Sequence, residues 1–337
     1  RVRRPVNQNS VPITWNEAMT STTASVWVRS EDEDGFLPEG PRSIVVEGRE
    51  AVIWVNIQTA ANSTTGGLHL RYWDDGEQGL WNLRGRPGFV LPTDKPGTVF
   101  LGMGKELGTL DLESNEFRVL GKIPDANPRT IINDGEVYPG GREIVFGTKD
   151  PQFADPLASL YHFALADGIV TPIAEKQTCS NGKLFHRDAK GLVLFDIDTP
   201  TRSVVRYRFE VGLRGAKADG VALDLRDQPG FPDGMCSCGD GKAIIAFYNP
   251  EAVAAGRAVR FDLTTGRALE EWTTPGSPRV TCPLLVKRPD GVKLILTTAD
   301  EGMPPEMREK CPEAGSLFIA DTSLADGSAN ELVKLGT

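Results

Sequence analysis

Long apolar segments are missing from this sequence, in which no run approaches the ~18 residues that a membrane-spanning helix requires. No signal peptide is recognisable near the first residue. The five cysteines are an odd number and include no pair of CxxC motifs, so neither a disulfide framework nor a thiolate zinc site is favoured. We therefore expect reduced, buried thiols in a cytoplasmic protein that contacts no membrane.

Basic residues are scarce relative to acidic ones. The chain of 337 residues has 37 Lys and Arg against 46 Asp and Glu, which gives a formal net charge of −9. This balance argues against nucleic acid or an anionic membrane surface as a partner. We expect a monomer or a weak homo-oligomer that binds a small-molecule substrate.

Stretches with helical periodicity are also nearly absent, and short β-rich runs take their place. Runs such as AVIWVNI, GTVFLGM and KAIIAFY recur roughly every 44 to 51 residues, and a second strand-like run follows each. Repeats of three or four short strands at this period are typical of a β-propeller. Six units fit the length, so we predict an all-β fold, a six-bladed β-propeller.

The repeats also suggest how the chain is divided. We predict a single propeller domain over residues 36–337, preceded by an N-terminal segment of residues 1–35. Length alone would suggest two domains, but all-β folds of this size are often single units. The run ASVWVRS at 24–30 is expected to supply the outer strand of the last blade, which closes the ring and removes a free edge.

Five of the six strands that open the units carry a glycine at the same point, and in four of these five a polar residue precedes it. The acids and amides directly before this glycine, or one residue earlier, are Glu39, Asn133, Asp134, Asn181 and Asp233. Equivalent positions of successive blades converge on the central axis, and clustered carboxylates repel unless a cation neutralises them. Any one of these polar residues followed by glycine would be typical of an ordinary turn. Their shared register instead predicts a channel site for a hard divalent ion such as Ca²⁺ or Mg²⁺.

Several motifs taken together resemble a known family. The stretches beginning NDGEVYPGGRE, TCSNGKLFH, FPDGMCSCGDGK and VTCPLLVKRPDG resemble blades three to six of the senescence-marker-protein-30/gluconolactonase/luciferin-regenerating-enzyme family. The likeness covers roughly residues 36–322. It implies a six-bladed propeller with one divalent ion in the central channel and, in many members, hydrolysis of sugar lactones.

The resemblance also implies roles for individual residues. Glu39, Asn181 and Asp233 are expected to bind the metal directly, with Ca²⁺ the first choice and Mg²⁺, Mn²⁺ or Zn²⁺ as alternatives. Asn133 is expected to face both the metal and the substrate. Asp233 is also the expected general base, and direct nucleophilic attack by its carboxylate stays open as a second route.

Two positions depart from the pattern of sugar-lactonase members. Ile131 stands where those proteins often have an arginine, and the nearest arginine is Arg129. Gln152 stands where an ungapped reading places a glutamate. We expect Arg129 and Gln152 to bind the substrate, together with Phe89 on the inner strand of the second unit. These exchanges favour a substrate less polar than an aldonolactone.

The predicted function is therefore metal-dependent hydrolysis of a lactone. The ion would polarise the carbonyl group while Asp233 activates the attacking water. Two alternatives remain. The same site could hydrolyse other esters, such as phosphotriesters, or the propeller could bind calcium or another ligand without catalysis.

Overall fold

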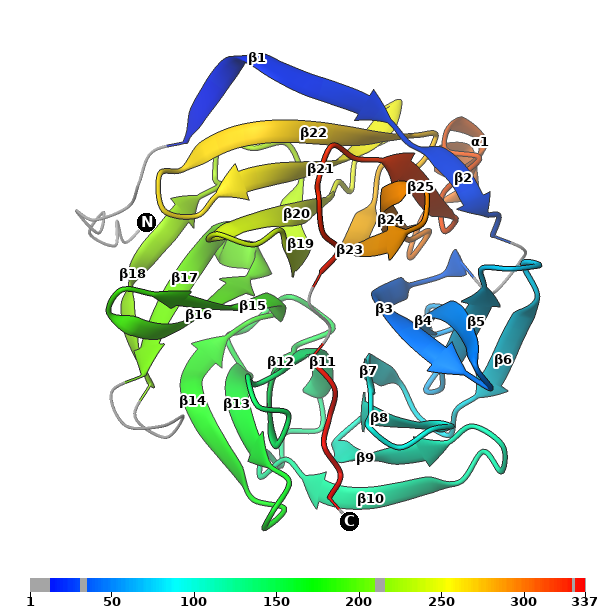
Figure 1. Cartoon of the computed structure of the whole chain (residues 1–337), viewed down its shortest axis with the longest axis vertical. Helices are drawn as coiled ribbons and strands as arrows, with labels where there is room; N and C mark the ends of the chain where they lie inside the picture. The colour runs from blue at the N-terminus through cyan, green and yellow to red at the C-terminus, as the bar shows by residue number, and fades with distance from the viewer. Residues whose placement is uncertain (1–12, 31–34, 210–215, 329–330, 337) are drawn as a thin grey trace.

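The fold is an all-β ring of six sheets around a central channel (Figure 1), which confirms the predicted six-bladed propeller. The computed structural model describes residues 13–30, 35–209, 216–328 and 331–336. Residues 1–12 and 31–34 of the predicted N-terminal segment lie outside these ranges. Each sheet is ordered from an inner strand at the channel to an outer strand at the rim.

Blades one to three each contain four consecutive strands. Blade one contains β3 (Pro38–Val46), β4 (Arg49–Asn56), β5 (Gly67–Tyr72) and β6 (Gln78–Asn82). Blade two contains β7 (Pro87–Pro92), β8 (Thr98–Met103), β9 (Glu106–Asp111) and β10 (Phe117–Lys122). Blade three contains β11 (Ile131–Val137), β12 (Glu143–Lys149), β13 (Ala158–Ala164) and β14 (Val170–Gln177).

Blades four to six complete the ring, and the last two include strands from the N-terminal segment. Blade four contains β15 (Ser180–Asp188), β16 (Gly191–Asp198), β17 (Ser203–Phe209) and β18 (Ala216–Asp224), with the 3₁₀ turn η2 (Thr199–Thr201) after β16. Blade five contains β19 (Phe231–Ser237), β20 (Lys242–Tyr248), β21 (Ala255–Asp262), β22 (Arg267–Pro275) and β1 (Thr14–Thr23). Blade six contains β23 (Val280–Arg288), β24 (Gly291–Thr298), β25 (Leu317–Asp321) and β2 (Ser25–Val28), with helix α1 (Pro305–Lys310) before β25.

Apolar side chains fill the spaces between neighbouring blades. Between blades one and two, for example, Ile53 and Leu68 pack with Val90 and Leu101, and all four are fully buried. Similar clusters lie at the other five interfaces. Strands buried on both faces read as continuous apolar runs rather than alternating ones, which is why runs such as GTVFLGM mark the blades in the sequence.

The N-terminal segment contributes an outer strand to two blades, whereas the sequence predicts such a strand for the last blade alone. The strand β2 pairs antiparallel with β25, with Ser25 opposite Ile319, and so becomes the outer strand of blade six. The strand β1 pairs parallel with β22, which adds a fifth strand to blade five. The sequence pattern predicts no strand at residues 14–23, because a parallel pairing at the rim leaves no hairpin turn to reveal it.

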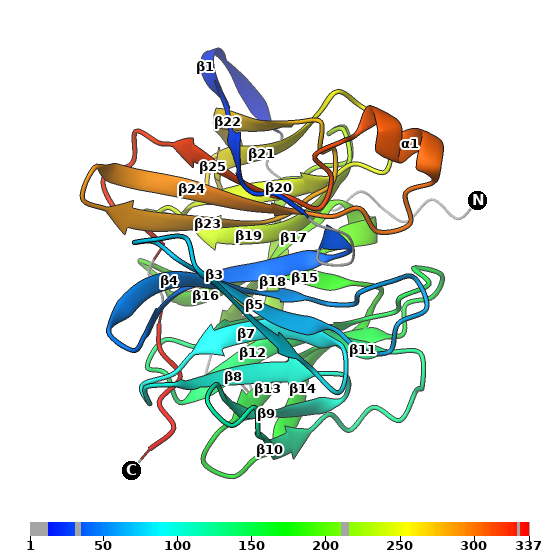
Figure 2. The same ribbon diagram turned by 90° about the vertical axis from the view of Figure 1, so that its right-hand side faces the viewer.

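The C-terminal segment crosses one end of the channel (Figures 1 and 2). The backbone N–H of Ser328 donates to the carbonyl of Leu285 in blade six, at 3.0 Å. Further along, the N–H of Val333 donates to the carbonyl of Pro92 in blade two, at 2.9 Å. The segment therefore connects blade six to blade two, the two neighbours of blade one, on the face opposite to α1 (Figure 2).

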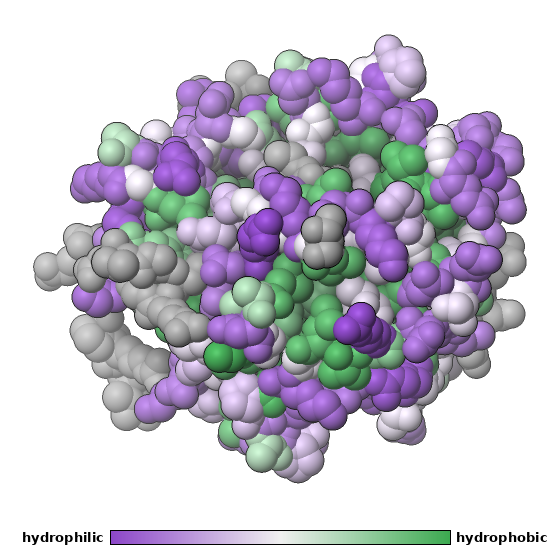
Figure 3. Space-filling model, turned by 60° about the horizontal axis from the view of Figure 1, so that its bottom comes forward, coloured by the Kyte–Doolittle hydropathy of each residue, from purple (hydrophilic) through white to green (hydrophobic). Residues whose placement is uncertain are grey.

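The distribution of polar residues on the surface and the state of the cysteines can be compared with the sequence-based expectations. Figure 3 shows hydrophilic residues around the margin of one face and apolar residues gathered nearer its middle. Among the described residues, no helix has the length and apolar character to cross a membrane. All five cysteines are free in this structure, four of them buried and Cys238 half-buried.

The inner strands approach one another closely around the channel. Their neighbours run in the closed order β3, β7, β11, β15, β19, β23 and back to β3. A Cβ atom at Gly88 would lie 2.5 Å from the carbonyl oxygens of Ile132 and Asn133, and one at Gly182 would lie 2.7 Å from that of Asp233. These glycines are needed for close backbone contact between blades and are not simply turn residues.

We expect the substitution Gly88→Ala to lower the unfolding free energy by about 1–3 kcal/mol, because an added methyl group would push apart two inner strands. Gly85→Ala is the matched control, since its methyl group would meet only the flexible side chain of Met103. Denaturant unfolding of both variants measures the difference. Equal stability of the two variants would show that the strands separate without cost.

Candidate active site

A backbone irregularity occurs at the same place in all six inner strands. In each, the pairing with the second strand of the blade shifts near the start of the inner strand. In β19, for instance, the shift falls between Pro232 and Met235, and in β15 it falls between Asn181 and Lys183. Such bulges bend a strand and redirect its side chains. Here they turn polar residues of the inner strands toward the channel.

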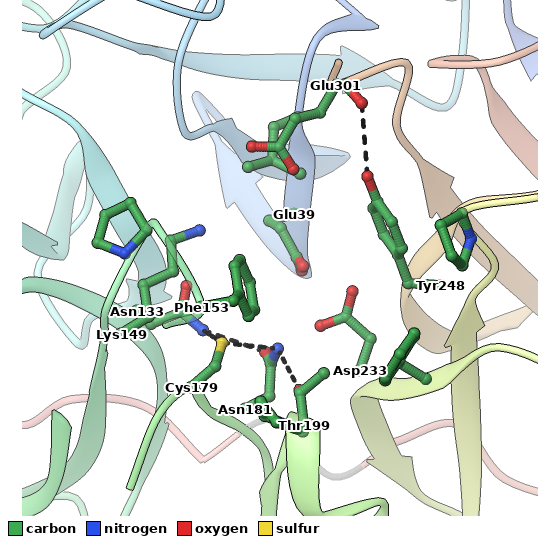
Figure 4. Close-up of a pocket in the computed structure, with 15 residues that line it drawn as sticks. Glu39, Asn133, Lys149, Phe153, Cys179, Asn181, Thr199, Asp233, Tyr248 and Glu301 are labelled. Carbon is green, nitrogen blue, oxygen red and sulfur yellow. Dashed lines mark hydrogen bonds between the residues drawn. The ribbon is translucent and has the colours of Figure 1, made fainter. Parts of the chain in front are cut away.

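The predicted polar residues meet in a cavity of about 510 Å³ at one end of the channel (Figure 4). Glu39, Asn133, Asn181 and Asp233 all line this cavity, and each is less than one-tenth exposed. Figure 4 shows the carboxyl groups of Glu39 and Asp233 directed toward the same space as the amide of Asn181. The side chains come from four different blades, so the ring closure brings them together.

Hydrogen bonds hold the two amides in place. The Nδ2 atom of Asn133 donates to Oδ1 of Asn181 at 3.2 Å and to the carbonyl of Ser180 at 3.1 Å. The Nδ2 atom of Asn181 donates to Oγ1 of Thr199 at 3.1 Å, and that hydroxyl donates to the carbonyl of Pro232 at 2.9 Å. Thr199 therefore ties the strand that carries Asn181 to the strand that carries Asp233.

Burial dominates the electrostatics of the two carboxyl groups. It raises the pKa of Glu39 to about 8, an effect that the Asp134 carboxylate reinforces and the Lys149 ammonium opposes. Burial likewise raises the pKa of Asp233 well above its usual range, and the neighbouring Glu39 raises it further. Both groups resist ionisation together unless a cation lies between them.

These residues fit a hard divalent cation. Glu39, Asn181 and Asp233 offer only oxygen ligands, the set that Ca²⁺ and Mg²⁺ prefer. Their buried carboxyl groups carry the electrostatic penalty that a bound cation would remove. Within the described ranges, no three or more His, Cys, Asp or Glu side chains are grouped to hold a metal ion. The predicted site would therefore depend on an amide ligand as well as two carboxylates.

The structure does not place the three other predicted substrate contacts in the cavity wall. Arg129 instead pairs with Asp150 and, at 3.0 Å, with Asp155. Gln152 is exposed, and its backbone N–H donates to the Asp150 carboxylate at 3.1 Å. Asp150 and Arg129 thereby fix the loop after β12, which carries the lining residues Pro151 and Phe153.

Phe89 is fully buried between blades. Its ring lies 6.4 Å from that of Phe100 and 6.3 Å from that of Phe146, measured between centroids. The polar register position of blade two is occupied by Pro87 and Gly88, so the next side chain turns into the interface rather than the channel. The prediction of a substrate contact at Phe89 does not match this position.

The lining residues that were not predicted as site residues include three with charged or phenolic side chains. Lys149 is the last residue of β12, Tyr248 is the last residue of β20, and Glu301 follows β24. All three lie at or beyond the ends of second strands, outside the inner-strand register that the sequence analysis used. A signal was available for Lys149, because a lysine that completes the apolar run EIVFGTK is rarely buried without a role.

The raised pKa values predict how stability depends on pH in the metal-free protein. Between the ordinary value of 4.5 and about 8, folded Glu39 holds a proton that the unfolded chain has released. The unfolding free energy should therefore fall as pH rises through this window, by about 1.4 kcal/mol for each pH unit. Adding Ca²⁺ should restore stability most strongly near pH 8.

Thermal unfolding at pH 5 and pH 8, with chelator or with Ca²⁺, measures this effect. Glu39→Gln should weaken both the loss with pH and the gain with Ca²⁺, whereas Glu251→Gln, at an exposed site, should leave both unchanged. A wild-type protein whose metal-free stability does not differ from that of Glu39→Gln at either pH would contradict the assignment of this carboxyl group.

Comparisons with known proteins agree with the architecture and the motifs. Regucalcin from Xenopus laevis is 25% identical over 228 residues, which are 66% of this chain and 73% of that protein. A calcium-binding regucalcin from Agrobacterium tumefaciens has a similar structure, with a TM-score of 0.75 and 20% identity over 94% of this chain and 98% of its own. A gluconolactonase from Xanthomonas campestris follows with a TM-score of 0.58 and 14% identity, covering 85% of this chain and 86% of its own.

The family assignment rests on a longer match. The model of the SMP-30/Gluconolactonase/LRE-like region matches residues 37–300, which span all six inner strands. This confirms the resemblance seen in the NDG, SNG, PDG and TCP motifs. The chain belongs to the SMP-30/gluconolactonase/LRE-like family.

Proposed function

We propose that this protein is a divalent-metal-dependent hydrolase of lactones. The observation that carries the proposal is the meeting of Glu39, Asn133, Asn181 and Asp233 in one cavity at the channel end. Membership of a family that includes gluconolactonases supports it. A calcium-binding regucalcin with the same fold supports the metal.

The metal would be held by Glu39, Asn181 and Asp233, with Ca²⁺ the first choice for an all-oxygen set. A divalent cation in such a site supplies Lewis acidity toward a carbonyl oxygen and stabilises the negative charge that develops there. Thr199 contributes indirectly, because its hydroxyl oxygen accepts a hydrogen bond from the Asn181 amide N–H and so orients the amide oxygen toward the cavity.

The remaining chemistry falls to the residues of this chain. Asp233 accepts a proton from water while the water oxygen bonds to the lactone carbonyl carbon. The ring C–O bond then breaks, the departing oxygen takes up the proton, and a hydroxy acid is released. Asn133 lines the same cavity and would contact the substrate. The alternative route, attack by the Asp233 carboxylate itself, uses the same group in the same place.

A second candidate substrate class is favoured by the walls of the cavity. Leu37, Pro151, Phe153, Phe231 and Tyr248 make much of the lining apolar. Such walls suit a lactone with a hydrocarbon body, but they also suit other esters, including phosphotriesters. A panel that contains sugar lactones, alkyl lactones and phosphotriesters would rank the three classes by kcat/KM.

We expect Asp233→Asn to lower kcat for the preferred lactone by about 10²–10⁴-fold, because the variant lacks the base that accepts the water proton. Proton release from γ- and δ-lactones measures the rate, using chelator-stripped protein before and after addition of Ca²⁺, Mg²⁺, Mn²⁺ or Zn²⁺. Turnover should appear only after metal is added.

Asp227→Asn serves as the control, since Asp227 is an exposed acid near the start of β19. It should retain wild-type turnover. Metal binding that stabilises the fold without turnover of any lactone or ester in the panel would replace the hydrolase with a non-catalytic binding role.

A further inference from the structure

Lys149 is the one cationic side chain among the described residues that line the cavity. It is only 7% exposed, and Figure 4 shows it on the same wall as Asn133. It ends a strand whose preceding residues, from Ile144 to Thr148, are all buried. The amine is therefore held at the edge of the cavity by a rigid element rather than by a mobile loop.

The ammonium group lacks a close anionic partner within the described part of the chain. No carboxylate there lies within the 4.0 Å of an ion pair with it. The charge is felt over a longer range by Glu39 and Asp233, whose pKa values it lowers in opposition to burial. The side chain is largely buried but lines the cavity, so its ammonium group is available to an anion that binds there.

Metal binding would reduce the negative charge that Lys149 faces in the cavity. In the proposed function, Glu39 and Asp233 are ligands of a divalent cation, which neutralises two of the three carboxylates that line the cavity and leaves Glu301 as the third. Arg129 cannot share the task of binding an anion, because Asp150 and Asp155 already hold it. An anion in the metal-loaded cavity would then find Lys149 as its cationic partner among the lining side chains.

The other lining residues indicate which chemical groups the rest of such a ligand would carry. Phe153 and Phe231 lie on its wall, together with Pro200, Pro250 and Tyr248. A volume of about 510 Å³ suits a small organic molecule rather than a polymer. The matching ligand combines an apolar body with one anionic group.

We propose that Lys149 binds a carboxylate on the substrate, and that the substrate is a lactone or similar ester whose apolar body carries that carboxylate. The proposal rests on the proposed function for the ester, but the carboxylate is assigned by Lys149 alone. Lys149 is then the residue that selects acidic over neutral substrates of the same shape.

Binding without turnover tests this selection directly. Calorimetry with Ca²⁺-loaded protein compares 4-phenylbutyrate with its neutral amide, 4-phenylbutyramide. Wild-type protein should bind the acid about tenfold to a hundredfold more tightly than the amide. Lys149→Met, which keeps the length and removes the charge, should bind both equally weakly, and Lys149→Arg should keep most of the preference.

Two further controls separate the effect from folding and from general charge. Lys190→Met removes an exposed lysine at the turn between β15 and β16 and should leave the preference unchanged. Thermal unfolding should find Lys149→Met at least as stable as wild type. An acid preference that survives in Lys149→Met would assign the carboxylate to the metal and overturn the proposal, as would equal binding of acid and amide to wild type.

Kinetic measurements distinguish the carboxylate site at Lys149 from the proposed lactone hydrolysis. For a pair of lactones that differ only in a carboxylate, Lys149→Met should raise KM for the acidic lactone by about tenfold or more and leave the neutral lactone within about twofold. If neither lactone is hydrolysed while the acid preference depends on Lys149, the hydrolase fails and the anion site stands. If both are hydrolysed with equal KM by wild type and variant, the anion site fails and the hydrolase stands.

Discussion

The close meeting of six inner strands around one axis is the constraint on which the rest of the molecule depends. Adjacent inner strands come so near that Gly88, Gly182 and Gly234 have no room for a side chain against the next blade. The bulges beside these glycines release the strands from regular alternation. Polar side chains can therefore point into the channel while the remaining residues of the same strands still fill the interfaces between blades.

That geometry concentrates charge where water is scarce. Glu39 and Asp233 are brought together by ring closure, not by local sequence, and burial makes their simultaneous ionisation costly. Hydrogen bonds fix the backbone around these carboxyl groups. Thr199 links blades four and five through its hydroxyl, and Lys183 donates to the carbonyl of Asn181 at 2.8 Å. The framework thus holds two buried carboxyl groups in place, and the positive charge that would allow both to ionise has to come from a bound cation.

The sequence was most informative where a residue occupies a position that every blade repeats. Six blades follow from the period of the buried strands, and Glu39, Asn133, Asn181 and Asp233 follow from one register position. Their role as ligands remains a prediction from family resemblance. Phe89 failed as a cavity residue because the bulge at Gly88 changes which face the next side chain occupies. Lys149 was missed because it belongs to a second strand, outside the inner-strand positions that were compared, although its place at the end of a buried run was a signal. The loop after β12 could not be foreseen either, since Arg129, Asp150 and Asp155 fix it through contacts that no periodicity encodes.

The C-terminal segment gives the channel a direction. It crosses the face opposite to the one that carries α1, and it is fastened there to blades two and six. These two blades are not neighbours in the ring, so pulling them apart would also break the hydrogen bonds that this segment makes to each of them.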